Sequence, residues 1–273
     1  MARPNRYSWS EKKIETFLRQ GRGSGVGREY RPWLNVTDVP SIGVSSQPYF
    51  AKIGRCLQLL SDLESAAFLR FWWDPSVVDI REQFPLPRTE TRNIASSIGV
   101  KHPRYPRTSL DVIMTTDMLV TRLNDGAIEF QAYSVKYAED ASRQRTVEKL
   151  EIERLYWERS GVRWRVISET ELPAVETLNL SWIFGADETL CLLGSKGQDL
   201  MERLAGGFAS APYRRAASVC LFLDNQFGRD PGLHLAVLRA AIKRRVVSVD
   251  LSRGLVPQAL CSAFEFRADR GFE

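Results

Sequence analysis

The sequence predicts an α/β protein with a mixed central sheet, and three observations support this fold class. A helical segment at residues 61–73 leads into an apolar strand at 77–84. Two apolar segments within residues 110–136 flank an Asn-Asp-Gly turn, which is a strong signal for a β-hairpin. A helix at about 146–160 precedes residues 162–167, where side chains alternate as they do in a strand. This order of helix, strands, helix and strand is typical of an α/β fold.

The chain before this core is expected to begin with a short helix and a basic loop. A capping-box pattern starts at Ser8, so we expect a helix from there to the stop signal at Gly21. The glycine-rich residues 22–31 follow a helix and not a strand, which argues against a dinucleotide site. They form either a flexible linker or a loop near DNA, where Arg22 would contact DNA or a partner. The proline-containing residues 93–107 are expected to be irregular.

The character of the sequence changes near residues 169–173, so we expect two domains, at 1–170 and 171–273. The second should contain helices, then the basic turn Lys243-Arg244-Arg245 and a strand at 246–251. This order resembles a winged-helix module, which would bind DNA or a partner through the three basic residues. A small helical domain with a solvated basic face is the alternative. The helices are expected at residues 174–183, 198–204, 211–223 and 232–242.

The composition indicates a globular protein and argues against a membrane-spanning, secreted or zinc-stabilised one. The 273 residues are 44% hydrophobic and 26% charged, which is normal for a globular chain. No apolar run approaches 18 residues and no secretory signal is visible, so we expect a cytoplasmic protein without a membrane span. The four cysteines are far apart and form no CxxC pair, which argues against a structural zinc site. A net charge of +5 suits a polyanionic partner such as DNA.

The predicted hairpin brings three polar residues to one face. If Asp125 and Gly126 are the central turn residues, the register places Asp117 opposite Ser134. Lys136, two residues further on, then points the same way. An acid and a lysine on adjacent strands can hold a metal ion and a scissile phosphate. The alternative is the solvent-exposed polar face of an edge hairpin, and a turn shifted by one residue would move Asp117 to the other face.

Several sequence blocks, in order across residues 8–168, resemble TnsA, the endonuclease subunit of heteromeric cut-and-paste transposases. The two most specific are LLSDLES and VVDIREQFPL. The resemblance is vague over the C-terminal hundred residues. It implies a restriction-endonuclease-like fold for the first domain. The remaining blocks are GRGSGVGREYRPWL, KHP, TTDMLV and TVEKLEIERLYW.

The resemblance also implies an active site. Glu64, Asp117 and Lys136 match the acid, acid, lysine set of restriction-endonuclease-like nucleases. Glu64, Asp117 and the main-chain carbonyl of Val135 would hold Mg²⁺, for which Mn²⁺ could substitute, since Mg²⁺ prefers oxygen ligands. Lys136 would orient the attacking water and offset charge on the phosphate. From the residues alone, Ser61-x-x-Glu64 is a capping box, which gives Glu64 a purely structural interpretation.

Three further residues leave alternatives open. The family commonly has glutamine two residues before the lysine, whereas this chain has Ser134, whose shorter side chain is a weaker metal ligand. Glu153 borders the apolar face of its helix and is either an outer-shell acid or the partner of Lys149 in a surface ion pair. Glu82 is either satisfied by a basic neighbour or near the metal.

By this resemblance the protein would cut the non-transferred strand at the 5′ ends of a mobile element. Its partners would be double-stranded DNA at the transposon ends, a TnsB-like transposase and a TnsC-like AAA+ ATPase. Partner contact is expected in the second domain. The alternatives are a stand-alone repair or restriction nuclease of the same fold, and a catalytically weakened, DNA-binding assembly subunit.

Overall fold

The computed structural model describes residues 8–38, 44–188 and 195–267. The chain divides into two compact units, Met1–Leu172 and Pro173–Glu273. Each unit contains its own buried side chains and is described by itself below.

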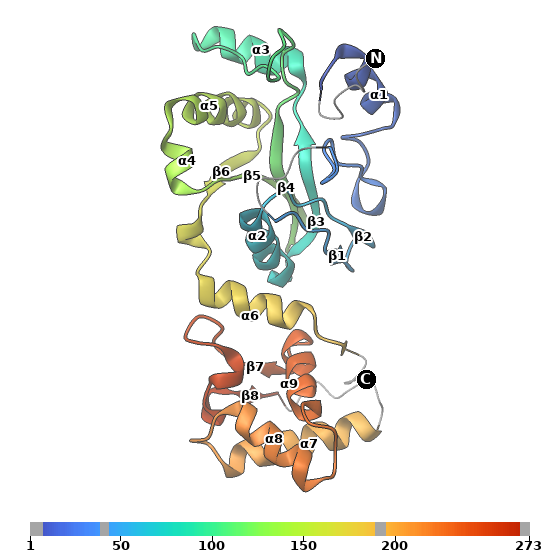
Figure 1. Cartoon of the computed structure of the whole chain (residues 1–273), viewed down its shortest axis with the longest axis vertical. Helices are drawn as coiled ribbons and strands as arrows, with labels where there is room; N and C mark the ends of the chain where they lie inside the picture. The colour runs from blue at the N-terminus through green and yellow to red at the C-terminus, as the bar shows by residue number, and fades with distance from the viewer. Residues whose placement is uncertain (1–7, 39–43, 189–194, 268–273) are drawn as a thin grey trace. The chain divides into compact units, whose positions relative to one another are not determined.

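The first unit is built on a four-stranded mixed sheet (Figure 1). Its strands are β3 (Val77–Pro85), β4 (Thr115–Asn124), β5 (Ala127–Val135) and β6 (Arg163–Ile167), in the spatial order β3-β4-β5-β6. β3, β4 and β5 pair antiparallel, whereas β6 runs parallel to β5. The predicted mixed sheet is therefore confirmed, and the crossover between β5 and β6 is made by helices.

Two helices cover opposite faces of this sheet. α2 (Asp62–Trp73) packs on the face of β5 that carries Tyr133, whose ring centroid lies 4.8 Å from that of Phe71. The neighbouring residue, Ala132, points to the other face and joins a buried cluster with side chains of α5 (Gln144–Arg159). Alternation along β5 thus separates the two faces. The end of β5 therefore lies between α2 on one face of the sheet and α5 on the other.

A helix occupies part of the segment that was expected to be irregular. α3 (Arg88–Ser97) begins directly after Pro87, and buries Thr91, Ile94 and Ala95. These positions have the spacing of one helix face, but only two of them are apolar, so the periodic signal is weak. The expectation of irregular structure was therefore wrong for residues 93–97.

The N-terminal helix is present but its cap differs from the one expected. α1 (Glu11–Arg19) is capped by Ser10, whose hydroxyl accepts from the backbone N–H of Lys13 at 3.2 Å, and not by Ser8. Gly21 follows with φ +71°, in agreement with its predicted role as a stop. The remaining short elements of this unit are η1 (Gly27–Glu29), β1 (Tyr49–Phe50), β2 (Arg55–Cys56), α4 (Ala138–Ser142) and η2 (Glu169–Glu171).

The glycine-rich basic loop is a folded part of the first unit and not a flexible linker. Gly23 has φ +80°, and a Cβ placed there would lie 2.2 Å from Cγ of Pro85 in β3. The backbone N–H of Gly27 donates to Oδ2 of Asp79 at 3.1 Å. The loop therefore approaches β3 so closely at Gly23 that any side chain would collide with the strand.

The second unit is mainly helical, as expected. Asp224 in α8 is fully buried and joins α8 to α9, because it accepts from the backbone of Gly232 and from both the backbone and the ring of His234. The strand expected at residues 246–251 is only two residues long. The elements are α6 (Ala174–Phe184), α7 (Ser195–Ser210), α8 (Ala216–Gln226), α9 (Leu233–Lys243), β7 (Val247–Ser248), η4 (Val256–Gln258), η5 (Cys261–Ala263) and β8 (Glu265–Phe266). Among the helices that the structure describes, none is long and apolar enough to cross a bilayer.

Candidate active site

The predicted hairpin register is confirmed. Asn124 pairs with Ala127, and the ladder continues without interruption to Met118 and Tyr133. The ladder ends at this pair, so Asp117 and Ser134 lie just beyond it, and their direct opposition stays a prediction. The two turn residues, Asp125 and Gly126, have φ of 48° and 81°, as a two-residue type I′ turn requires.

Asp117 and Lys136 form a direct ion pair at the end of this hairpin. Nζ of Lys136 lies 2.6 Å from Oδ2 of Asp117 and donates to the main-chain carbonyl of Val135 at 3.1 Å. The same carboxylate oxygen accepts from the backbone N–H of Val135 at 2.7 Å. Asp117 is 8% exposed and Ser134 is 1% exposed, so the alternative of a solvent-exposed polar face is wrong.

Glu64 makes the predicted capping contact and also faces the sheet. The hydroxyl of Ser61 accepts from the backbone N–H of Glu64 at 3.1 Å, while the Glu64 carboxylate accepts from the backbone N–H of Leu60 at 2.9 Å. The side-chain amide of Gln83 donates to the same carboxylate at 3.3 Å. Gln83 was not expected at this site, because its orientation depends on a left-handed backbone (φ 48°) within β3 that no sequence pattern revealed.

The carboxyl groups of this region repel one another. Burial, and then the negative charge of Asp117, raise the pKa of Glu64 to about 7. The same two causes raise the pKa of Glu153 to about 7. Burial alone would lower the pKa of Lys136, but the ion pair with Asp117 outweighs it and raises that pKa. Glu64, Glu153 and Lys136 thus share one electrostatic cluster centred on Asp117.

Glu153 of α5 is buried beneath the end of the hairpin. Its Oε2 accepts from the hydroxyl of Ser134 at 2.7 Å, and its Oε1 accepts from the hydroxyl of Thr116 at 2.8 Å and from Nε1 of Trp164 at 3.0 Å. The side chain is 4% exposed, so the alternative of a surface ion pair with Lys149 is wrong. Thr116 and Trp164 were missed, since only the packing of α5 on the sheet brings them to Glu153.

The oxygens of this cluster fit a hard divalent cation. Within the described ranges, no three His, Cys, Asp or Glu side chains gather closely enough to hold a metal by themselves. The expected set, however, contains two carboxylates, from Glu64 and Asp117, and one carbonyl, from Val135. The ammonium of Lys136 already binds two of these three groups, which shows that they attract and can accommodate a positive charge. An oxygen-only set suits Mg²⁺ or Mn²⁺ and not zinc.

The alternative of Glu82 near the metal is not what the structure shows. This fully buried carboxylate accepts two hydrogen bonds from the guanidinium of Arg55, at 2.7 and 2.8 Å, and one from the backbone N–H of Gln58 at 2.9 Å. Glu82 is therefore satisfied by a basic neighbour, which was the other interpretation of its strand position.

The arginine expected near DNA is engaged within its own unit. The guanidinium of Arg22 lies 3.6 Å from the ring centroid of Phe17, donates to the carbonyl of Trp33 at 3.0 Å and pairs with Asp38. Its side chain is 13% exposed. Arg22 therefore stabilises the folded loop. It could contact DNA only after its hydrogen bond to Trp33 and its ion pair with Asp38 were broken.

The basic turn of the second unit is likewise partly committed to structure. Nζ of Lys243 donates to the carbonyls of Phe184 and Ala186 and pairs with Glu188 at 3.1 Å. Arg244 is the C-cap of α9 and is only half-exposed. The expected interpretation of Lys243 as a contact for DNA or a partner is not supported, because its ammonium is already used.

The mixed sheet, its flanking helices and the ion pair of the buried Asp117 with Lys136 define the first unit as a restriction-endonuclease-like nuclease domain. Residues 74–169 match the family described as TnsA-like endonuclease N terminal. Over 184 residues the chain is 45% identical to the Transposon Tn7 transposition protein TnsA of Escherichia coli. This alignment covers 67% of the chain and 66% of that relative. The chain belongs to the TnsA family.

Proposed function

We propose that the protein is the endonuclease subunit of a heteromeric transposase. It would cut the non-transferred strand at the 5′ ends of a mobile element, with Mg²⁺ as its metal. The observation that carries this proposal is the ion pair between the buried carboxylate of Asp117 and the partly exposed Lys136, with Glu64 beside it, at the end of a hairpin in a member of the TnsA family.

Each side chain of the cluster has a role in this chemistry. Glu64, Asp117 and the carbonyl of Val135 would hold the metal. When bound, a divalent ion supplies charge neutralisation at the phosphate and lowers the pKa of its water. The ammonium of Lys136 has three N–H donors, two of which bind Asp117 and Val135. The third can donate to a phosphate oxygen or orient the attacking water.

Glu153 and Ser134 would help to position the metal-binding groups and Lys136, because they are buried beneath the end of the hairpin that carries Asp117, Val135 and Lys136. The hydroxyl of Ser134 donates to Glu153, so it can accept a hydrogen bond but has no second proton to donate. A water held by this oxygen would take the place of the amide that the family commonly carries. The same observation favours a second candidate, an assembly subunit with weak cleavage, since a committed hydroxyl is a poorer ligand than an amide.

Strand-specific nicking tests the proposal. The substrate is a duplex that carries an element's end, labelled separately on each strand, and the assay is run with and without a TnsB-like and a TnsC-like protein. We expect Mg²⁺-dependent cleavage of the 5′ end only, and Mn²⁺ should substitute. Cleavage that needs no partner would favour a stand-alone repair or restriction nuclease. DNA binding without cleavage in either metal would favour the assembly subunit.

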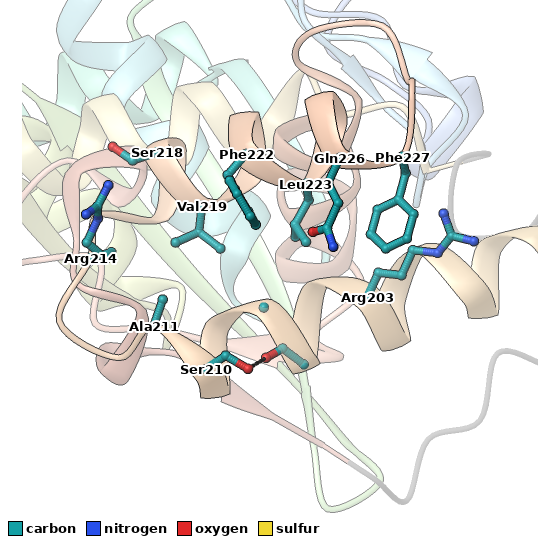
Figure 2. A pocket seen from close by; sticks show the side chains of 12 residues that line it. Arg203, Ser210, Ala211, Arg214, Ser218, Val219, Phe222, Leu223, Gln226 and Phe227 are labelled. Atoms are coloured by element: carbon teal, nitrogen blue, oxygen red, sulfur yellow. Dashed lines mark hydrogen bonds between the residues drawn. The ribbon is translucent and has the colours of Figure 1, made fainter.

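The second unit is proposed as the partner-binding domain, separated from the catalytic domain near residue 170. A groove of about 620 Å³ lies between α7 and α8 (Figure 2). Val219 and Leu223 form part of its apolar lining, and Phe222 is 63% exposed at its edge. Arg203 and Arg214 also line the groove. Large exposed apolar side chains of this kind are typical of interaction sites.

The charges around the groove indicate the chemistry of the partner segment. Arg214 is exposed and has no ion pair within the described part of the chain, whereas Arg203 pairs with Asp199 and lies over the ring of Phe227. A partner segment with apolar side chains would fill the apolar groove, and acidic side chains on the same segment would pair with Arg214. We assign this segment to the TnsC-like ATPase.

A further inference from the structure

A large cavity opens beside Lys136 within the first unit. Its volume is about 1090 Å³, and it is lined by the ends of β4 and β5, by α5 and by the loop that precedes β4. One wall is aromatic, because Trp9 stacks on Tyr105 with ring centroids 4.2 Å apart, and Trp33 also lines the cavity. Ser134 and Lys136 are part of the lining, so the cavity reaches the candidate active site.

Two cations in the lining have no counterion. Lys149 of α5 and Arg107 of the loop are exposed, and neither side chain has a hydrogen bond or ion pair among the residues that the structure describes. Arg104, a third cation of the lining, pairs instead with Asp111 at 3.5 Å. Cations that line a cavity without a carboxylate partner are suited to bind an anion.

The surroundings of Lys149 are positively charged. Burial, and then the charges of Arg145 and Lys136, lower the pKa of Lys149. Lys149 precedes Glu153 by four residues, so both side chains lie on the same face of α5. Glu153 reaches under the hairpin, and Lys149 therefore lies about one helical turn away from the buried end of the site.

Arg107 is held in an uncommon backbone conformation. Its φ is +61°, in the left-handed region that non-glycine residues seldom adopt. The turn around it is fixed by Thr108, whose backbone and hydroxyl both donate to the carbonyl of Tyr105, at 3.2 and 2.9 Å. Such conformations persist where the surrounding structure imposes them, often at binding sites.

We infer that this cavity holds the DNA strand that is cut, and that Lys149 and Arg107 bind phosphates on either side of the scissile phosphate at Lys136. The inference rests on the proposed function and adds two positioning residues to it. Lys149 and Arg107 reach the cavity from α5 and from the loop, and the aromatic wall borders the sugars. Contacts to phosphates carry no sequence information, so both residues act on any duplex alike.

The test is the salt dependence of DNA binding by the full-length chain. Binding of a labelled duplex is measured without divalent cation, so that nothing is cut, for wild type, Lys149→Ala, Arg107→Ala and the double variant. Each lost phosphate contact should reduce the slope of log affinity against log salt by about 0.9. Arg159→Ala is the matched control, since Arg159 is an exposed cation of the same helix that does not line the cavity. Lys149→Arg should restore the slope.

Nicking separates this inference from the proposed function. In single-turnover assays the double variant should need at least tenfold more DNA for half-maximal rate and retain most of the maximal rate. A slope equal to that of Arg159→Ala, or no binding of duplex by the wild type, would overturn the inference even if cleavage is observed. The predicted loss of binding in a protein that cuts nothing in Mg²⁺ or Mn²⁺ would retain Lys149 and Arg107 as phosphate contacts of this cavity and reject the nuclease.

Discussion

At the scale of single residues, Asp117 is the centre of the site because four groups respond to its charge. Its carboxylate pairs with Lys136, accepts from the backbone of Val135, and raises the pKa of both Glu64 and Glu153. Removing a buried carboxylate that accepts hydrogen bonds usually destabilises a protein, because its donors lose their acceptor. Here the loss of one negative charge also relieves repulsion between carboxylates, so the two effects oppose each other.

We therefore predict that Asp117→Ala abolishes nicking but leaves the domain folded. The loss of rate should exceed the 10–100-fold that is typical for removal of a metal's outer-shell partner. Asp117→Asn is the matched variant, since its amide oxygen can still accept from Val135 while the charge is gone. Nicking in Mg²⁺ and thermal unfolding are measured on both variants. Nicking at the wild-type rate by either one would reject Asp117 as a ligand.

A second residue-scale prediction concerns Glu153 and pH. Its pKa is raised from 4.5 to about 7 in the folded state. Its contribution to stability is therefore full below about pH 4.5 and is lost as the pH rises through 7. Glu153→Gln stays neutral at every pH, and its amide can donate to Ser134, whose hydroxyl can reverse. Without divalent metal, the variant should gain thermal stability relative to wild type between pH 5 and pH 8. If the difference in melting temperature between the variant and the wild type does not change with pH, the pKa of Glu153 is not raised in the folded state.

The hairpin residues could be predicted from the sequence, whereas their neighbours could not. A two-residue turn fixes the register over the whole ladder, so the pairing from Asn124 to Met118, which brings Asp117 near Val135 and Lys136, followed from residues close in sequence. The hydrogen bonds to Glu153 cross from strands to a helix, and the contact of Gln83 with Glu64 depends on a local change of backbone direction. No periodic pattern encodes either feature. Glu64 makes the capping contacts predicted from the sequence, and its carboxylate also lies close enough to Asp117 to feel its charge.

At the scale of elements, the glycine-rich loop illustrates the same limit. Its composition suits a linker, a phosphate-binding loop or a packed turn, and the choice depends on what lies beside it. In the structure it lies against β3, and Arg22 is bound by Trp33 and Asp38. α3 was missed for a related reason, because its one buried face is short and includes Thr91.

Two glycines of this loop give a matched prediction. Gly23 and Gly27 both have positive φ, but only at Gly23 would a Cβ collide, at 2.2 Å from Pro85; at Gly27 nothing lies within 4 Å. Overpacking of this kind typically costs about 1–3 kcal/mol. Gly23→Ala should therefore lower the free energy of unfolding by that amount more than Gly27→Ala, as measured by denaturant unfolding. Equal effects would mean that the loop does not pack on β3.

At the scale of the whole molecule, the match to the family model supports the first unit and does not extend to the second. The family match, at residues 74–169, lies entirely in the first unit and includes Asp117 and Lys136, although Glu64 precedes it. The second unit was expected to bind DNA or a partner through its basic turn. In the structure Lys243 is used for internal contacts, whereas an apolar groove lies elsewhere in the unit and is lined by Arg214, which has no ion pair with any residue that the structure describes. A protein partner is therefore favoured over DNA for this unit.

The final prediction tests that assignment. Phe222→Ser and Arg214→Glu should each weaken binding of the TnsC-like ATPase at least tenfold, since one removes an apolar anchor and the other repels an acidic segment. Leu221→Ser is the control, because Leu221 is 48% exposed on the same helix but does not line the groove. Binding is measured by calorimetry with the full-length proteins, and unfolding temperatures confirm that the variants are folded. If Leu221→Ser weakens binding as much as Phe222→Ser does, the groove is not the contact, and α8 meets its partner through the opposite face.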